Sequence, residues 1–167
     1  MLSEAFTVDN SLESRDPESG DLLRICESLN RVGARYLVIG GMAMVVHGFN
    51  RGTEDIDLLV DRTAENIQKL REALSILPDN AVQQVDDTDI ETYGVVRVAD
   101  EVVVDLMGSA CGIDFESAIT EVEWHDFEGI RIPFASPELL LRTKQTVREK
   151  DAIDQLFLKR IIAERNT

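Results

Sequence analysis

The chain has 167 residues, of which 44% are hydrophobic and 29% are charged, and its formal net charge is -15. This length suits a single globular domain with a real hydrophobic core. The negative charge argues against a broad basic surface for duplex nucleic acid, although a few cations and a metal can still bind a nucleotide. The two cysteines, Cys26 and Cys111, form no metal-binding pair, and we expect both to be buried free thiols rather than a disulfide.

The N-terminal residues have no basic start followed by an apolar core, so they do not resemble a secretory signal. The longest apolar stretch, residues 36–49, is too short to cross a bilayer and contains glycines. We therefore expect a cytoplasmic protein that does not enter a membrane. Residues 1–18 are polar and acidic, which predicts a flexible extension, and residues 19–167 are expected to form one domain.

The first half of the chain alternates between helical and strand patterns. An apolar stripe predicts a helix over residues 21–31 that stops at Gly33. A short buried strand over residues 35–39 leads through a double-glycine turn into an apolar helix over residues 42–48. A loop over residues 50–54 precedes a strand over residues 55–60, and Thr63 can cap a helix that reaches residue 77.

The second half of the chain is expected to contain two hairpins and the closing helices. Strands over residues 92–98 and 102–107 flank one turn, and strands over residues 122–127 and 130–134 flank the other. A short helix is expected over residues 113–119. Ser136 and Pro137 predict a helix start, so residues 139–147 and 152–162 form two helices or one bent helix. These elements predict an α/β (α+β) fold with a mixed sheet of about four or five strands flanked by helices.

Three aspartates on predicted strands are candidate metal ligands. Asp55 and Asp57 are two residues apart on one strand, so their side chains point to the same face and repel each other unless a cation lies between them. Asp105 lies in a second, apolar strand. Magnesium prefers such oxygen ligands together with substrate phosphates. The alternative is that the pair lies at a strand edge and that Asp105 is a solvated strand end.

A double glycine, Gly40-Gly41, precedes the predicted apolar helix. Glycine allows the backbone to approach a ligand closely, and amides at a helix start can bind phosphate oxygens. A pair of glycines alone is more often a tight turn. The sequence contains neither GxGxxG nor GxxxxGK[ST], so a dinucleotide-binding motif and a Walker motif are both excluded.

A strand, GG, a helix, the segment T-x-D-I-D-L and a later strand aspartate together resemble the nucleotidyltransferase superfamily with the polymerase-β-type fold. The resemblance covers residues 36–158 and is closest to the small prokaryotic AbiEii-like and minimal nucleotidyltransferases. It implies that Gly40 and Gly41 contact the triphosphate. It also implies that Asp55, Asp57 and Asp105 form a catalytic triad that binds two Mg²⁺ ions, with Mn²⁺ as an alternative.

Further residues match the same resemblance. Arg51 and Thr53 fit an R-x-T-x-D-h-D pattern, which implies that Arg51 reaches a phosphate and that Thr53 braces the turn. Lys144 and Arg148 fit a basic run of the closing helices. Their i, i+4 spacing predicts one helix face that neutralises phosphate charge. All four could instead be solvated residues, with Asp151 capping the next helix or pairing with Arg148.

The resemblance implies an enzyme that moves a nucleoside monophosphate from an NTP to a hydroxyl of a protein, an RNA end or a small molecule, with release of pyrophosphate. Its partners would be the NTP and that acceptor, and the oligomeric state is left open. Met42, Ala43 and Met44 supply no hydroxyl after the glycines. A catalytically inactive nucleotidyltransferase-fold binding or regulatory protein, for example of a toxin–antitoxin pair, is therefore the alternative. Phosphate-ester hydrolysis at a carboxylate metal site is a third hypothesis.

Overall fold

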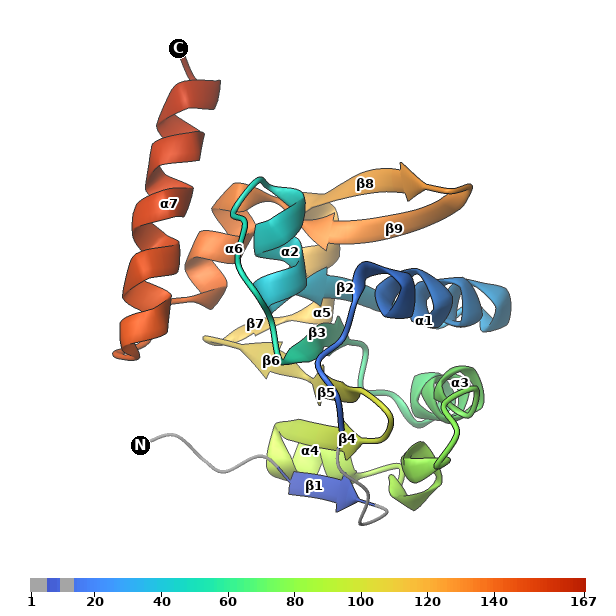
Figure 1. Ribbon diagram of the computed structural model, residues 1–167. Coiled ribbons are helices and arrows are strands. Elements are labelled where there is room, and N and C mark those ends of the chain that lie inside the picture. Colours follow the sequence, from blue (N-terminus) through green and yellow to red (C-terminus); the bar gives the residue numbers. More distant parts are fainter. Residues whose placement is uncertain (1–5, 10–13) are drawn as a thin grey trace.

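The computed structural model describes residues 6–9 and 14–167, and within them a seven-stranded mixed sheet forms the centre of the domain (Figure 1). The strand order is β1-β4-β5-β3-β2-β9-β8. The strands are Phe6–Asp9 (β1), Tyr36–Ile39 (β2), Asp55–Val60 (β3), Val95–Ala99 (β4), Val103–Met107 (β5), Val122–Phe127 (β8) and Ile130–Ala135 (β9), and a separate ladder pairs Ser109–Ala110 (β6) with Ile113–Asp114 (β7). The predicted α/β fold with a mixed sheet is confirmed, and the sheet is larger than expected.

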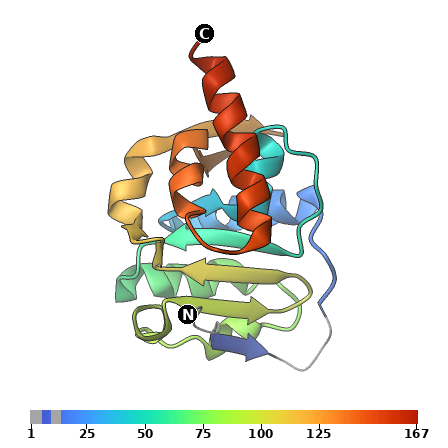
Figure 2. The ribbon, with the colours of Figure 1, turned by 90° about the vertical axis from the view of Figure 1, so that its left-hand side faces the viewer.

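Helices cover both sides of this sheet (Figures 1 and 2). The helices are Ser19–Val32 (α1), Gly40–Val46 (α2), Ala64–Leu74 (α3), Asp89–Tyr93 (α4), Phe115–Ala118 (α5), Pro137–Thr143 (α6) and Glu149–Arg165 (α7). In the two views α1 and α3 lie on one side, whereas α6 and α7 lie on the other. Short 3-10 turns occur at Ala81–Gln84 and Ile119–Glu121.

Several helix ends follow the signals in the sequence. Gly33 ends α1 in the left-handed conformation with φ 72°, which glycine adopts at no steric cost. The Thr63 hydroxyl accepts a hydrogen bond from the Asn66 amide at the start of α3, and the Ser136 hydroxyl accepts one from the Leu139 amide at the start of α6. The closing segment consists of two separate helices rather than one bent helix.

The predicted N-terminal extension lies partly outside the described residues, because residues 1–5 and 10–13 are not described. The remainder packs against the domain. Strand β1 pairs in parallel with β4 at the edge of the sheet. The Ser14 hydroxyl donates to the Asp100 carbonyl over 2.6 Å, and the Arg15 guanidinium lies 2.6 Å from the Glu101 carboxylate. This part of the segment therefore contacts the β4–β5 hairpin, which its polar sequence did not indicate.

Both cysteines are free thiols in the structure, but only one is buried as expected. Cys26 is fully buried in α1, whereas Cys111 is exposed in the turn between β6 and β7, so the prediction of burial is wrong for Cys111. Its φ of 48° fits a tight reversal at the surface. Across the described part of the chain, no helix combines the length and apolar character needed to cross a bilayer.

Strand register aligns one residue from each of four neighbouring strands. Ile39 of β2 is opposite Asp57 of β3, Asp57 is opposite Asp105 of β5, and Asp105 is opposite Arg97 of β4. Residues in register across a sheet project to the same face. The sheet therefore brings two carboxylates and a guanidinium into one row, next to the end of β2 where the double glycine begins.

Asp100 fixes the turn that connects β4 to β5. Its side chain is 1% exposed, and its carboxylate oxygens accept hydrogen bonds from the amides of Asp79, Ala81 and Glu101 over 3.0, 3.0 and 2.7 Å. We predict that Asp100→Ala lowers the free energy of unfolding by about 3 kcal/mol, because it leaves buried amides without a charged acceptor. Urea denaturation measures this change. The control Asp126→Ala, at an exposed hairpin position, should stay within about 0.5 kcal/mol of the parent, and equal losses in both variants would contradict the assignment.

Candidate active site

Three carboxylates converge at the face of the sheet beside α6. Asp55, Asp57 and Asp105 each offer a ligand oxygen, and these oxygens lie within 4.8 Å of one another. In the described residues this is the one group of three or more acidic, histidine or cysteine side chains so arranged. The pairing of β3 with β5 in parallel brings Asp105 to the two aspartates of β3. The sequence-predicted residues thus lie together, and we call them the acidic cluster.

Repulsion within the acidic cluster is only partly balanced. Burial, followed by the charges of Asp55 and Asp105, raises the pKa of Asp57 well above its ordinary value, although the charge of Lys144 opposes the shift. Burial and the charge of Asp105 also raise the pKa of Asp55, against the opposing charge of Arg97. Closely spaced carboxylate oxygens that lack sufficient positive charge fit a hard divalent cation such as Mg²⁺ or Mn²⁺.

One cation of this site was missed in the sequence. Arg97 donates from Nε to Asp105 Oδ1 over 2.9 Å and from Nη2 to Asp105 Oδ2 over 3.0 Å, and Nη2 lies 3.3 Å from Asp55 Oδ2. The register of the β4–β5 hairpin places Arg97 opposite Asp105. The sequence predicts this hairpin but not which residues pair across it. With the register known, Arg97 would have been identified as the residue opposite Asp105.

The double glycine packs directly against the acidic cluster. Gly40 has a φ of +67°, and a Cβ atom there would lie 2.0 Å from Asp57 Oδ2. A Cβ atom on Gly41 would lie 2.6 Å from Thr53 Oγ1. The Thr53 hydroxyl donates to the Asp55 carbonyl over 2.9 Å. Gly40 is therefore needed for the close approach of α2 to β3, and Gly41 for its close approach to the loop before β3. A hydroxyl group lies beside Gly41 although no serine follows the glycines.

Lys144 and Arg148 do not share a helix face, so this prediction is wrong. Helix α6 ends at Thr143, Lys144 follows as its C-cap, and Arg148 is the N-cap of α7. The break occurs because the Asp151 carboxylate accepts hydrogen bonds from the Thr146 hydroxyl and from Arg148 Nε, which turns the chain into the new helix. The pairing of Asp151 with Arg148, one of the alternatives, is observed.

Lys144 is buried within a network of α7 carboxylates that the sequence did not single out. Its side chain is 6% exposed, and its Nζ atom lies 2.9 Å from Asp154 Oδ2 and 3.6 Å from Asp151 Oδ1. Asp154 Oδ2 also lies 3.0 Å from Arg51 Nη2. Arg51 is thus paired with α7 rather than solvated. The spacing of Asp151, Asp154 and Leu158 on one buried face of α7 is the signal that could have identified this network.

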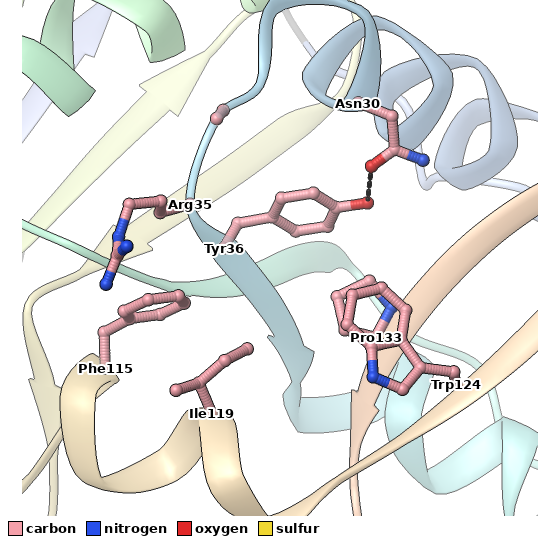
Figure 3. A pocket seen from close by; sticks show the side chains of 8 residues that line it. Asn30, Arg35, Tyr36, Phe115, Ile119, Trp124 and Pro133 are labelled. Carbon is pink, nitrogen blue, oxygen red and sulfur yellow. Dashed lines mark hydrogen bonds between the residues drawn. The ribbon is translucent and has the colours of Figure 1, made fainter.

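Asp57 of the acidic cluster, Lys144 and Arg148 line a small cavity of about 80 Å³, together with Gly40 and Asp151 among others. A larger pocket of about 300 Å³ lies at the other end of β2 (Figure 3). There the Tyr36 hydroxyl donates to Asn30 Oδ1 over 2.9 Å. We place the candidate site at the smaller cavity, because Asp57, Lys144 and Arg148 line it and the ligand oxygens of Asp55 and Asp105 lie within 4.8 Å of that of Asp57.

The close approach of Gly40 to Asp57 gives a testable prediction about stability. Gly40→Ala should lower the free energy of unfolding by more than about 2 kcal/mol, because it adds a clash to a left-handed backbone conformation. Gly20→Ala is the matched control: Gly20 lies in α1 with nothing within 4 Å of an added Cβ. This control should be stabilised by about 0.5–1 kcal/mol. Urea denaturation compares the two, and a Gly40→Ala variant as stable as the parent would refute the packing argument.

The raised pKa of Asp57 predicts a pH dependence of stability. As pH rises past the ordinary aspartate pKa, the unfolded chain loses its proton before the folded protein does, so the metal-free protein becomes less stable. Asp57→Asn removes this penalty. We expect the metal-free variant to melt at a higher temperature than the parent at neutral pH, and the difference to vanish towards about pH 4. Thermal unfolding in chelator across this range measures it; a variant less stable than the parent at neutral pH would contradict the electrostatic argument.

Comparison with known families matches residues 21–152 to the family described as nucleotidyl transferase AbiEii toxin, type IV toxin–antitoxin system. A search of curated proteins gives no match. Among solved structures, a Thermotoga maritima protein provisionally assigned as a nucleotidyltransferase is 16% identical with a TM-score of 0.49, over 95% of each chain. The family match spans most of the chain and includes the double glycine and all three aspartates. The chain therefore belongs to the AbiEii family of nucleotidyltransferase toxins.

Proposed function

We propose that this protein transfers a nucleoside monophosphate from an NTP to a hydroxyl acceptor in a reaction that depends on divalent metal. Membership of the AbiEii family supports nucleotidyl transfer. The observation that carries the metal dependence is the convergence of Asp55, Asp57 and Asp105 within 4.8 Å. In the reaction the acceptor oxygen bonds to the α-phosphorus, the bond to the pyrophosphate oxygen breaks, and the hydroxyl proton leaves with a base.

Each member of the acidic cluster has a proposed role. Asp55 and Asp57 would hold the metal, and Asp105 would hold it as well or accept the proton of the attacking hydroxyl. When bound there, two Mg²⁺ ions, or Mn²⁺ in their place, supply charge neutralisation and Lewis acidity at the α-phosphate. Gly40 and Gly41 would contact triphosphate oxygens through backbone amides at the start of α2, and Gly40 lines the cavity.

The cations have two different proposed roles. Lys144 and Arg148 line the cavity and would neutralise phosphate charge as the bond breaks. Arg51 pairs with Asp154, and Asp154 also pairs with Lys144. We therefore assign Arg51 the role of fixing Asp154, and through it Lys144. Arg51 would reach a phosphate only after its ion pair with Asp154 breaks. Thr53 would brace the loop through its hydrogen bond to the Asp55 carbonyl.

The size of the cavity limits what it can enclose. Pockets that bury whole ligands measure about 300–1,000 Å³, whereas this cavity is about 80 Å³. It suits the metal and phosphate end of an NTP, with the sugar, base and acceptor in the open space outside. The family places the protein in a toxin–antitoxin setting, and we propose the cytoplasm, where NTPs are available, as its location.

Asp57→Asn tests the proposed function most simply. We expect transfer of label from α-labelled NTPs to cell-extract macromolecules to fall at least about a hundredfold, because one metal ligand has lost its charge. Asp126→Asn, at an exposed hairpin position, is the matched control and should keep full transfer. Circular dichroism of both variants checks that the fold is retained.

The products and the binding step separate the competing hypotheses. Release of pyrophosphate with transfer of label supports the proposal, whereas release of orthophosphate alone would replace it with hydrolysis. Calorimetry with ATP or GTP and magnesium identifies a binding protein without activity, which would bind nucleotide but transfer no label. Equal transfer by Asp57→Asn and the parent would remove the mechanism.

A further inference from the structure

We propose that Arg97 is a resident cation of the acidic cluster, which divalent ions must displace from Asp105 and Asp55 before the cluster is fully loaded. This inference rests on the proposed function, because it takes the cluster as the metal site. It adds a competing cation from a third strand, β4, to the carboxylates of β3 and β5, and it predicts how tightly the protein binds a divalent ion when no nucleotide is present.

The contacts of Arg97 are those of a cation seated on ligand atoms. Both oxygens of Asp105 accept hydrogen bonds from its guanidinium, over 2.9 and 3.0 Å, in the bidentate geometry that arginine forms with carboxylates. The same Nη2 atom reaches Asp55 Oδ2 at 3.3 Å. One guanidinium therefore spans two strands and contacts two of the three carboxylates.

The position of Arg97 follows from the sheet and not from a flexible surface contact. Arg97 lies opposite Asp105 in the antiparallel β4–β5 pair, and Asp105 lies opposite Asp57 in the parallel β5–β3 pair. Side chains directly opposite each other on antiparallel strands are close neighbours. Arg97 is thus held beside the cluster by its backbone, whatever the cluster binds.

Exposure shows how Arg97 can leave. The Asp105 side chain is 6% exposed, whereas the Arg97 side chain is 42% exposed. Asp105 is fixed in the buried sheet, but the guanidinium can rotate outward into solvent, where the energetic cost of losing a carboxylate partner is small. Among the described residues, Arg97 hydrogen-bonds to Asp105 and Asp55 but not to Asp57. A divalent ion can therefore reach Asp55 and Asp57 first, and it can bind between Asp55 and Asp105 only when Arg97 moves.

The two possible roles of Arg97, competing with the metal or supporting its ligands, predict opposite effects on metal binding. A cation that competes for Asp105 and Asp55 weakens the binding of a divalent ion, so its removal should tighten binding. A side chain that only holds the ligands in place strengthens metal binding, so its removal should weaken it. In both cases the metal-free protein loses stability when Arg97 is removed, so stability alone does not distinguish them.

The test measures binding of Mn²⁺ alone, without nucleotide, by the electron paramagnetic resonance signal of the free ion. The proteins are the parent, Arg97→Met, Arg97→Lys and the control Arg160→Met, which removes an exposed arginine of α7 that pairs with Glu164. We expect Arg97→Met to bind Mn²⁺ about tenfold more tightly, since one unit charge a few ångströms away changes binding by this order. Arg97→Lys, which keeps the charge but loses the bidentate contact, should lie between it and the parent.

Each outcome decides the matter. Tighter binding in Arg97→Met with no change in Arg160→Met supports the inference. If Arg97→Met does not fold, tighter binding in Arg97→Lys than in the parent supports it. Equal or weaker Mn²⁺ binding in both Arg97 variants overturns the inference while the metal site stands. Absence of Mn²⁺ binding in every protein overturns the metal site itself, and the inference with it.

Discussion

Electrostatic repulsion among three carboxylates in a partly buried region of the sheet is the constraint on which the rest of the structure depends. Burial alone raises the pKa of an aspartate, and two neighbouring carboxylates raise that of Asp57 further. A fold selected for stability alone would replace such a residue with a neutral one. The arrangement is understandable if a bound cation neutralises the carboxylates. The metal-free protein is then less stable at a place where function requires the carboxylates.

The surrounding elements each supply a part of that arrangement. The sheet fixes the ligands, because β5 pairs in parallel with β3 and brings Asp105 into register with Asp57. The double-glycine corner brings α2 against the same carboxylate without a side chain in between. The break between α6 and α7 places Lys144 beside Asp57 at the cavity, and Asp154, which also pairs with Arg51, holds Lys144 there. Positive charge thus approaches the cluster from two sides, Lys144 from the closing helices and Arg97 from β4.

Much of this could be predicted from the sequence, because local signals were strong. The i, i+2 spacing of Asp55 and Asp57 decides that they share a face, and the apolar strand around Asp105 decides that it lies in the sheet. The parts that were missed depend on tertiary context. Arg97 reaches the cluster only because of the strand register. Lys144 and Arg148 lie at the ends of different helices because Asp151 accepts a hydrogen bond from Arg148 at the start of α7, which helical periodicity does not reveal. The exposure of Cys111 likewise depends on a turn that its apolar character does not indicate.

Anomalous scattering from a crystal grown with Mn²⁺ and a non-hydrolysable NTP analogue tests the central claim most directly. The account predicts manganese peaks within bonding distance of carboxylate oxygens of Asp55 and Asp57, with the analogue's phosphates next to Gly40 and Gly41. An analogue bound elsewhere, or manganese that avoids these aspartates, would contradict it.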